Sequence, residues 1–185
     1  MKVEDFIKVV KTGDPLFVAG KSWMSDVIET LTDQQFSHAA TFYWDGIVAM
    51  VAEESERDGG ADPILNAGFR IVPFDAWITQ QTGPIYFGVA PKVVHDHPEK
   101  VLDLIHWYLG RPADQHYGFG SLLPILVNNW LCRINKNINI PIPSWAEVCS
   151  TFSTAVENAA GAELPSDETP GDLAAKSGPL TLLEV

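Results

Sequence analysis

Basic residues are scarce in this chain of 185 residues. Twelve lysines and arginines stand against 24 aspartates and glutamates, which gives a net charge of −12. So acidic a chain repels nucleic-acid phosphates and anionic lipid surfaces at long range. We therefore expect no nucleic acid among its partners.

Long apolar runs are also missing. No stretch reaches the roughly 20 apolar residues that a membrane-spanning helix needs. Glu4 and Asp5 occupy the region where a secretory signal peptide carries basic residues. We therefore expect no membrane span and a cytoplasmic location.

Cysteine is the third scarcity, since the chain has only Cys132 and Cys149. Without an export signal, both are expected to be reduced thiols and not a disulfide. Cys132 stands among Trp130, Leu131 and Ile134 and is expected to be a packing residue. Cys149 has to be judged from the helix in which it is expected to lie.

Apolar residues, by contrast, make up 46% of the chain, enough for the core of one compact domain over residues 1–185. The segment Gly161–Gly178, rich in Glu, Asp, Pro and Ser, is expected to be a loose loop or tail. Strand and helix signals alternate along the rest and predict an α+β fold. Strands are expected at Leu16–Val18, Phe36–Trp44, Ile47–Glu53, Ile71–Val72 and Ile85–Val89, and helices at Ser22–Thr30, Pro98–Leu109 and Ser144–Ala160.

The last of these helices carries Cys149 in its early part. Ser144 and Glu147 have the spacing of a capping box, which favours a helix start at this point. A thiol near a helix N-terminus, with an imidazole beside it, is held as a reactive thiolate. The alternative is that Cys149 is one more small residue of the apolar helix face.

A hairpin supplies the candidate imidazole. Asp45-Gly46 is a two-residue turn signal, and folding the chain about it places His38 directly opposite Glu53. A carboxylate next to a histidine fixes its tautomer and stabilises its charged form. The alternative pairs a core histidine with a solvent-facing strand end. Glu54 is the rival for the carboxylate role, but alternation along the strand favours Glu53.

The order of these motifs resembles one branch of a known superfamily. Ala19-Gly20-Lys21-Ser22-Trp23, Phe36-Ser37-His38-Ala39, Ala52-Glu53 and Cys149-Ser150 are similar to the YiiX-like permuted papain-like (NlpC-type) cysteine hydrolases, which are related to the lecithin:retinol acyltransferases. In that permuted branch the strand histidine precedes the helix cysteine, as His38 precedes Cys149 here. The resemblance implies an antiparallel sheet packed against the cysteine-bearing helix.

The resemblance also implies an activity, the cleavage of an amide or ester through a thioester. Cys149 would attack, His38 would shuttle the proton and Glu53 would orient His38. The Cys149 backbone N–H would contribute to an oxyanion hole. Tyr117, in a Gly/aromatic run, could line the cleft, although an ordinary loop aromatic is an equal alternative.

Two other function classes remain open. The same three residues could serve an acyltransferase, or the fold could be a binding module without turnover; the complete Cys, His and Glu set argues against the second. His95-Asp96-His97 could ligate a metal, but Pro98 makes helix capping the preferred interpretation. We therefore expect no metal and no cofactor, and a peptide, lipid or small-molecule acyl substrate.

Overall fold

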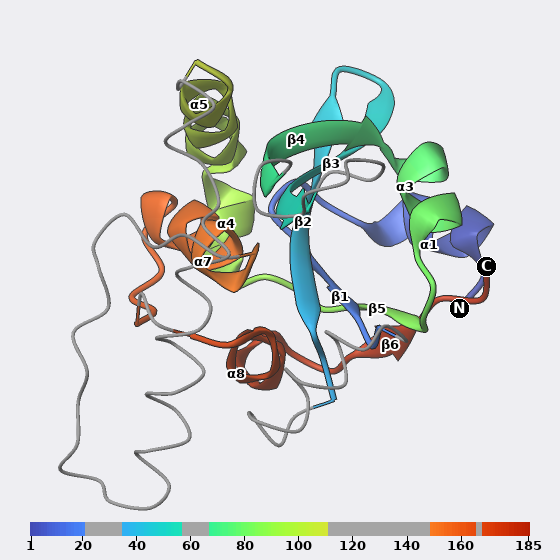
Figure 1. Cartoon of the computed structure of the whole chain (residues 1–185). Coiled ribbons are helices and arrows are strands. Elements are labelled where there is room, and N and C mark those ends of the chain that lie inside the picture. The colour runs from blue at the N-terminus through green and yellow to red at the C-terminus, as the bar shows by residue number, and fades with distance from the viewer. Residues whose placement is uncertain (21–34, 57–66, 111–148, 166–167) are drawn as a thin grey trace, which may run out of the picture.

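A computed structural model describes residues 1–20, 35–56, 67–110, 149–165 and 168–185 (Figure 1). The described strands form a six-stranded antiparallel sheet in the order β4-β3-β2-β1-β5-β6. The strands are β1 (Pro15–Val18), β2 (His38–Asp45), β3 (Val48–Glu56), β4 (Ala67–Pro73), β5 (Ile85–Phe87) and β6 (Thr181–Leu182). The helices are α1 (Val3–Val9), α3 (Phe74–Gln80), α4 (Lys92–Asp96), α5 (Pro98–Leu109), α7 (Cys149–Ala159) and α8 (Pro170–Lys176).

Helices cover both faces of this sheet, so the predicted α+β class is correct (Figure 1). One core cluster lies between the sheet and helices α1 and α3, and includes Phe6, Phe42 and Trp77. A second cluster lies on the other face, between the sheet and helices α5 and α7, and includes Phe69 and Phe152. Because β2 is buried on both faces, it reads as an almost continuous apolar run.

The predicted β2–β3 hairpin is present, but its turn lies one residue later than expected. Asp45 pairs with Val48, so Gly46 and Ile47 form the loop. Gly46 has a φ of 60°, which suits the first central position of a type II′ turn. The register pairs Thr41 with Ala52, and continuing it three residues puts residue 55, not Glu53, opposite His38.

Other predicted elements are confirmed with small changes of length. Strands β1, β4 and β5 and helix α5 lie where the apolar runs placed them. Helices α1, α3 and α4 and strand β6 were not predicted. The expected helix at Ser22–Thr30 and the expected cap at Ser144 lie outside the described residues. None of the described helices is long and apolar enough to cross a membrane.

The segment Gly161–Gly178 is wrongly predicted as loose, because it contains helix α8. Thr169 and Asp172 form a capping box, in which each side chain accepts a hydrogen bond from the other residue's backbone N–H. Leu173 is fully buried and packs with Phe17 of β1. The segment that its polar composition suggested to be a tail therefore contains a helix cap, at Thr169, and a buried apolar residue, Leu173.

Helix α7 is held to the sheet by apolar packing and by a side-chain hydrogen bond. Phe152 and Val156 are fully buried, and Ser153 Oγ accepts a 3.3 Å hydrogen bond from Thr41 Oγ1 of β2. Farther along, Glu157 is 2% exposed and lies close enough to Asp14 for their charges to interact. Burial, followed by the Asp14 charge, raises the pKa of Glu157 to about 7.

Asp14 itself joins three segments around this carboxyl. Its two oxygens accept hydrogen bonds from the backbone N–H groups of Lys11, at 2.8 Å, and Ala90, at 2.9 Å. His95 of α4 adds a contact of 2.7 Å to Asp14 Oδ1. Glu157 differs from Asp14, because its Oε1 has no hydrogen-bond partner among the described residues.

This arrangement predicts how stability depends on pH. The folded-state pKa of Glu157, about 7, is above its ordinary value of 4.5, so stability is full below the ordinary value and falls as pH rises between the two. Glu157→Gln removes the penalty of roughly 3 kcal/mol. We expect the free energy of unfolding of the variant to be higher than that of the parent at about pH 8, and the two values to converge near pH 5. Urea denaturation at both pH values measures this, and parallel pH profiles would contradict it.

Candidate active site

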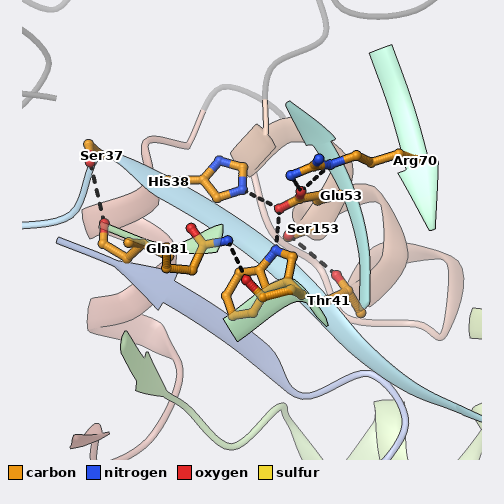
Figure 2. Close-up of polar contacts among 9 residues, drawn as sticks. Ser37, His38, Thr41, Glu53, Arg70, Gln81 and Ser153 are labelled. Carbon is orange, nitrogen blue, oxygen red and sulfur yellow. Dashed lines mark hydrogen bonds and ion pairs between the residues drawn. The ribbon is translucent and has the colours of Figure 1, made fainter. Parts of the chain in front are cut away.

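Glu53 of β3 lies at the centre of a buried polar group. Its side chain is 0% exposed, and both carboxylate oxygens accept hydrogen bonds. Oε1 receives the guanidinium of Arg70 from β4 at 2.5 Å, and Oε2 receives the indole N–H of Trp77 from α3 at 2.7 Å. Figure 2 shows His38 and Arg70 approaching the carboxylate from different sides.

His38 is the first residue of β2 and is a further partner of Glu53. Its Nε2 lies 2.6 Å from Glu53 Oε2. Because the observed register sets Ala40 opposite Glu53, the small methyl side chain leaves room for the carboxylate to reach diagonally to the histidine. Nε2 is thereby engaged, which leaves Nδ1 as the ring nitrogen that can serve another group.

That other group is the thiol of Cys149, which lies close enough to His38 for the two groups to shift each other's pKa. Cys149 is the first described residue of α7 and is 7% exposed. The nearby backbone N–H groups of Ala39 and Ser150 also favour its thiolate form. The thiol thus has an imidazole and two backbone donors around it.

The charges of these groups depend on one another. Burial disfavours a charged imidazole, but Cys149 and Glu53 outweigh it and raise the pKa of His38 well above its usual range. Burial likewise opposes ionisation of Glu53, yet His38, Arg70 and Trp77 lower its pKa to about 2. Burial disfavours the thiolate of Cys149, but other groups, chiefly His38, outweigh burial and lower the pKa of the thiol. The favoured state is a thiolate–imidazolium pair next to a carboxylate.

The structure therefore brings together the three residues that the sequence singled out, Cys149, His38 and Glu53. Glu53 is fully buried, which contradicts the alternative of a solvent-facing strand end. Glu54 pairs with Phe69, whose ring belongs to the cluster on the opposite face of the sheet. Glu54 is also fully buried.

The other candidates lie elsewhere. Tyr117 and Cys132 are outside the described residues, and nothing places them near the site. His95 contacts Asp14 and His97 contacts Glu99, so the two histidines serve different carboxylates. His97 is the residue preceding α5, but its side chain makes no capping hydrogen bond, so the expected capping role belongs to its backbone position alone.

Sequence reasoning missed Arg70 and Trp77. Arg70 is the one charged residue of β4, and Trp77 has an indole N–H that needs an acceptor when it is fully buried. Both residues indicate, from the sequence alone, that a buried hydrogen-bond acceptor is present. Their partner is not indicated in the same way, because the β3–β4 pairing that sets Arg70 opposite Glu53 is a long-range feature that no local pattern encodes. An arrangement of this kind can supply a nucleophilic sulfur, a proton carrier and a fixed charge that orients the carrier.

Comparison with known proteins adds one structural likeness. No protein-family model matches the chain, and no curated protein matches it by sequence. Among solved structures, it resembles the metalloprotein YiiX (DUF1105) from Escherichia coli O157:H7, with a TM-score of 0.51 and 20% sequence identity. The match covers 82% of this chain and 67% of the other. The chain therefore has a YiiX-like α+β fold.

Proposed function

We propose that this chain is a cysteine hydrolase that cleaves an amide or ester bond. The observation that carries the proposal is the placement of Cys149 beside His38, whose Nε2 lies 2.6 Å from the fully buried carboxylate of Glu53. A cysteine that only fills space in a core has no need of an imidazolium beside it, and such a charge is costly to bury without a purpose.

The reaction follows from the charges of this series. The thiolate of Cys149 attacks the carbonyl carbon of the substrate, and the electron pair of the C=O bond moves to its oxygen. As the tetrahedral intermediate collapses, His38 gives its proton to the departing amine or alcohol, which leaves a thioester. His38 then takes a proton from water, the resulting hydroxide attacks the thioester, and the acid product leaves as the thiol is regenerated.

The positions of the donors support this sequence of steps. Glu53 on Nε2 of His38 keeps Nδ1 directed at the sulfur in both halves of the cycle. The Cys149 backbone N–H is the proposed oxyanion donor, since it moves with the nucleophile. The nearby Ala39 and Ser150 N–H groups favour the thiolate before attack.

A permuted papain-like fold is part of the same proposal. Its support is the chain order, with strand residue His38 before helix residue Cys149, together with the YiiX-like fold. An acyltransferase would use the same steps with a second nucleophile in place of water. A binding module stays the alternative if Cys149 accepts no acyl group.

The description of YiiX as a metalloprotein raises the question of a metal here. Among the described residues, no group of three or more histidine, cysteine or acidic side chains is arranged to hold a metal ion. In the proposed site, His38 Nε2 and both oxygens of Glu53 already have protein partners. The described residues do not fit a bound metal, and no step is derived through one.

The nucleophile can be tested by alkylation. Because His38 favours the thiolate, iodoacetamide should label Cys149 far ahead of Cys132 at neutral pH and continue to do so in mildly acidic solution. Peptide mapping by mass spectrometry separates the two cysteines. Equal labelling of both in the folded protein, or faster labelling of Cys132, would remove Cys149 from the role.

The reaction can be tested with simple acyl probes. Incubation with p-nitrophenyl acetate and with peptidyl esters and anilides should release product and leave a transient acyl mass on Cys149. Cys149→Ala should abolish both signals. If the folded wild-type protein forms no acyl adduct with any of these probes, the binding-module alternative is favoured.

The role of Glu53 can be tested with a matched control. Glu53→Gln removes the charge that supports the imidazolium and should lower kcat/KM by about ten- to a thousand-fold. Since it also leaves Arg70 without its partner, it should cost about 3 kcal/mol of stability, so activity is measured well below its Tm. Glu157→Gln makes the same chemical change at another buried glutamate, which contacts no residue of the site, and should keep full activity. Equal activity in the two variants would contradict the role of Glu53.

A further inference from the structure

Arg70 is the only partner of Glu53 in the described part of the chain that always carries a positive charge. Its Nε donates to Oε1 of Glu53 and a terminal guanidinium nitrogen lies at 2.5 Å from the same oxygen, while the arginine side chain is 21% exposed. His38 and Trp77 both use the other oxygen, Oε2. The carboxylate is therefore divided, with one oxygen facing the imidazole and the indole and the other facing a guanidinium.

Among the described groups of the site, the charges balance when Arg70 is counted. In the reactive state Cys149 carries a negative charge, His38 a positive one and Glu53 a negative one, which leaves a net charge of minus one. The guanidinium of Arg70 brings the total to zero. A net charge in a site where Glu53 is 0% exposed is strongly disfavoured, and a buried group takes up a proton to avoid it.

We infer that Arg70 is a positioning residue of this site, whose fixed positive charge, acting through Glu53, keeps the cysteine as a thiolate while the histidine is protonated. The inference rests on the proposed function, since it assigns a role within the same Cys149–His38–Glu53 series. Arg70 does not touch the sulfur or a substrate, and its effect on Cys149 passes through two intervening side chains.

Trp77 has a different role among the residues that contact Glu53. Its indole N–H holds Oε2 at 2.7 Å but carries no charge, so it fixes direction without changing the charge balance. Among the described residues, the charged groups that interact with Glu53 include His38 from β2 and Arg70 from β4, and α3 contributes the neutral Trp77. Cys149 from α7 interacts with His38. Arg70 is thus the residue whose removal changes the net charge and leaves every reacting group in place.

The pH dependence of Cys149 alkylation tests the inference. Rates with iodoacetamide are measured between about pH 5 and 9, where the fall on the acid side reports protonation of the thiolate. Arg70→Gln should move this acid limb upward by about one pH unit or more, because loss of a nearby opposite charge shifts titration by that amount. Arg70→Lys keeps the charge and should leave the limb in place, even if the rate drops. Trp77→Phe should lower the rate and move the limb much less than Arg70→Gln.

Two results would overturn the inference. One is an acid limb in Arg70→Gln that coincides with that of the parent protein. The other is a shift in Arg70→Lys as large as in Arg70→Gln, since the lost hydrogen-bond geometry would then be responsible and the charge would not. A purely structural role for Arg70 would lower Tm and rate without moving the limb, which is the first of these results.

A double variant decides the matter if Arg70→Gln does not fold. Arg70→Gln alone strands a buried carboxylate, whereas Glu53→Gln together with Arg70→Gln removes both charges at once. The double variant should therefore melt at a higher temperature than Arg70→Gln, or fold where Arg70→Gln does not. If the double variant is no more stable than the single one, Arg70 does not act through Glu53 and the inference fails.

This inference and the proposed function can fail separately. Alkylation needs no substrate, so a shifted limb in Arg70→Gln supports the role of Arg70 even where no acyl probe is turned over. Conversely, turnover of acyl probes by the parent, with the limb of Arg70→Gln unmoved, would leave the hydrolase standing and remove Arg70 from it.

Discussion

The burial of one negative charge, that of Glu53, is the constraint on which the rest of this site depends. A carboxylate with no exposed surface remains ionised only if its environment replaces what water would supply. Here the replacement comes from three separate elements, with His38 on β2, Arg70 on β4 and Trp77 on α3. The same contacts that neutralise Glu53 fix the direction of the His38 ring, so the charge of the carboxylate and the orientation of the imidazole have one cause (Figure 2).

The sheet divides the site between its two faces. Glu53 and Trp77 belong to the face covered by α1 and α3, whereas Cys149 comes from α7, which packs on the other face. The two halves meet at the start of β2, where the strand backbone ends and the Ala39 N–H is available to the sulfur. The seating of α7 on the sheet therefore controls the distance between nucleophile and base.

Much of this architecture could be predicted from local signals. The hairpin, helix α5 and the candidate residues Cys149, His38 and Glu53 follow from turn residues, apolar spacing and motif order. Two kinds of feature could not be predicted. Arg70 becomes a partner of Glu53 only through the β3–β4 pairing, which is a long-range choice that no local pattern encodes. Helix α8 was misread because its polar composition outweighed the capping box at Thr169 and the single buried anchor, Leu173.

The misplaced hairpin turn shows why the pairing of His38 with Glu53 survived an error of register. Moving a two-residue loop by one position moves every cross-strand partner by two, and strand side chains repeat with a period of two. Glu53 therefore stays on the face of His38 but lies diagonally to it, with Ala40 directly opposite. A diagonal pair needs long side chains and a small neighbour, and the glutamate, the imidazole and the alanine meet both needs at 2.6 Å. An error of one residue in the pairing would instead have selected Glu54, whose face of the sheet holds Phe69 and the α5–α7 cluster in place of a histidine.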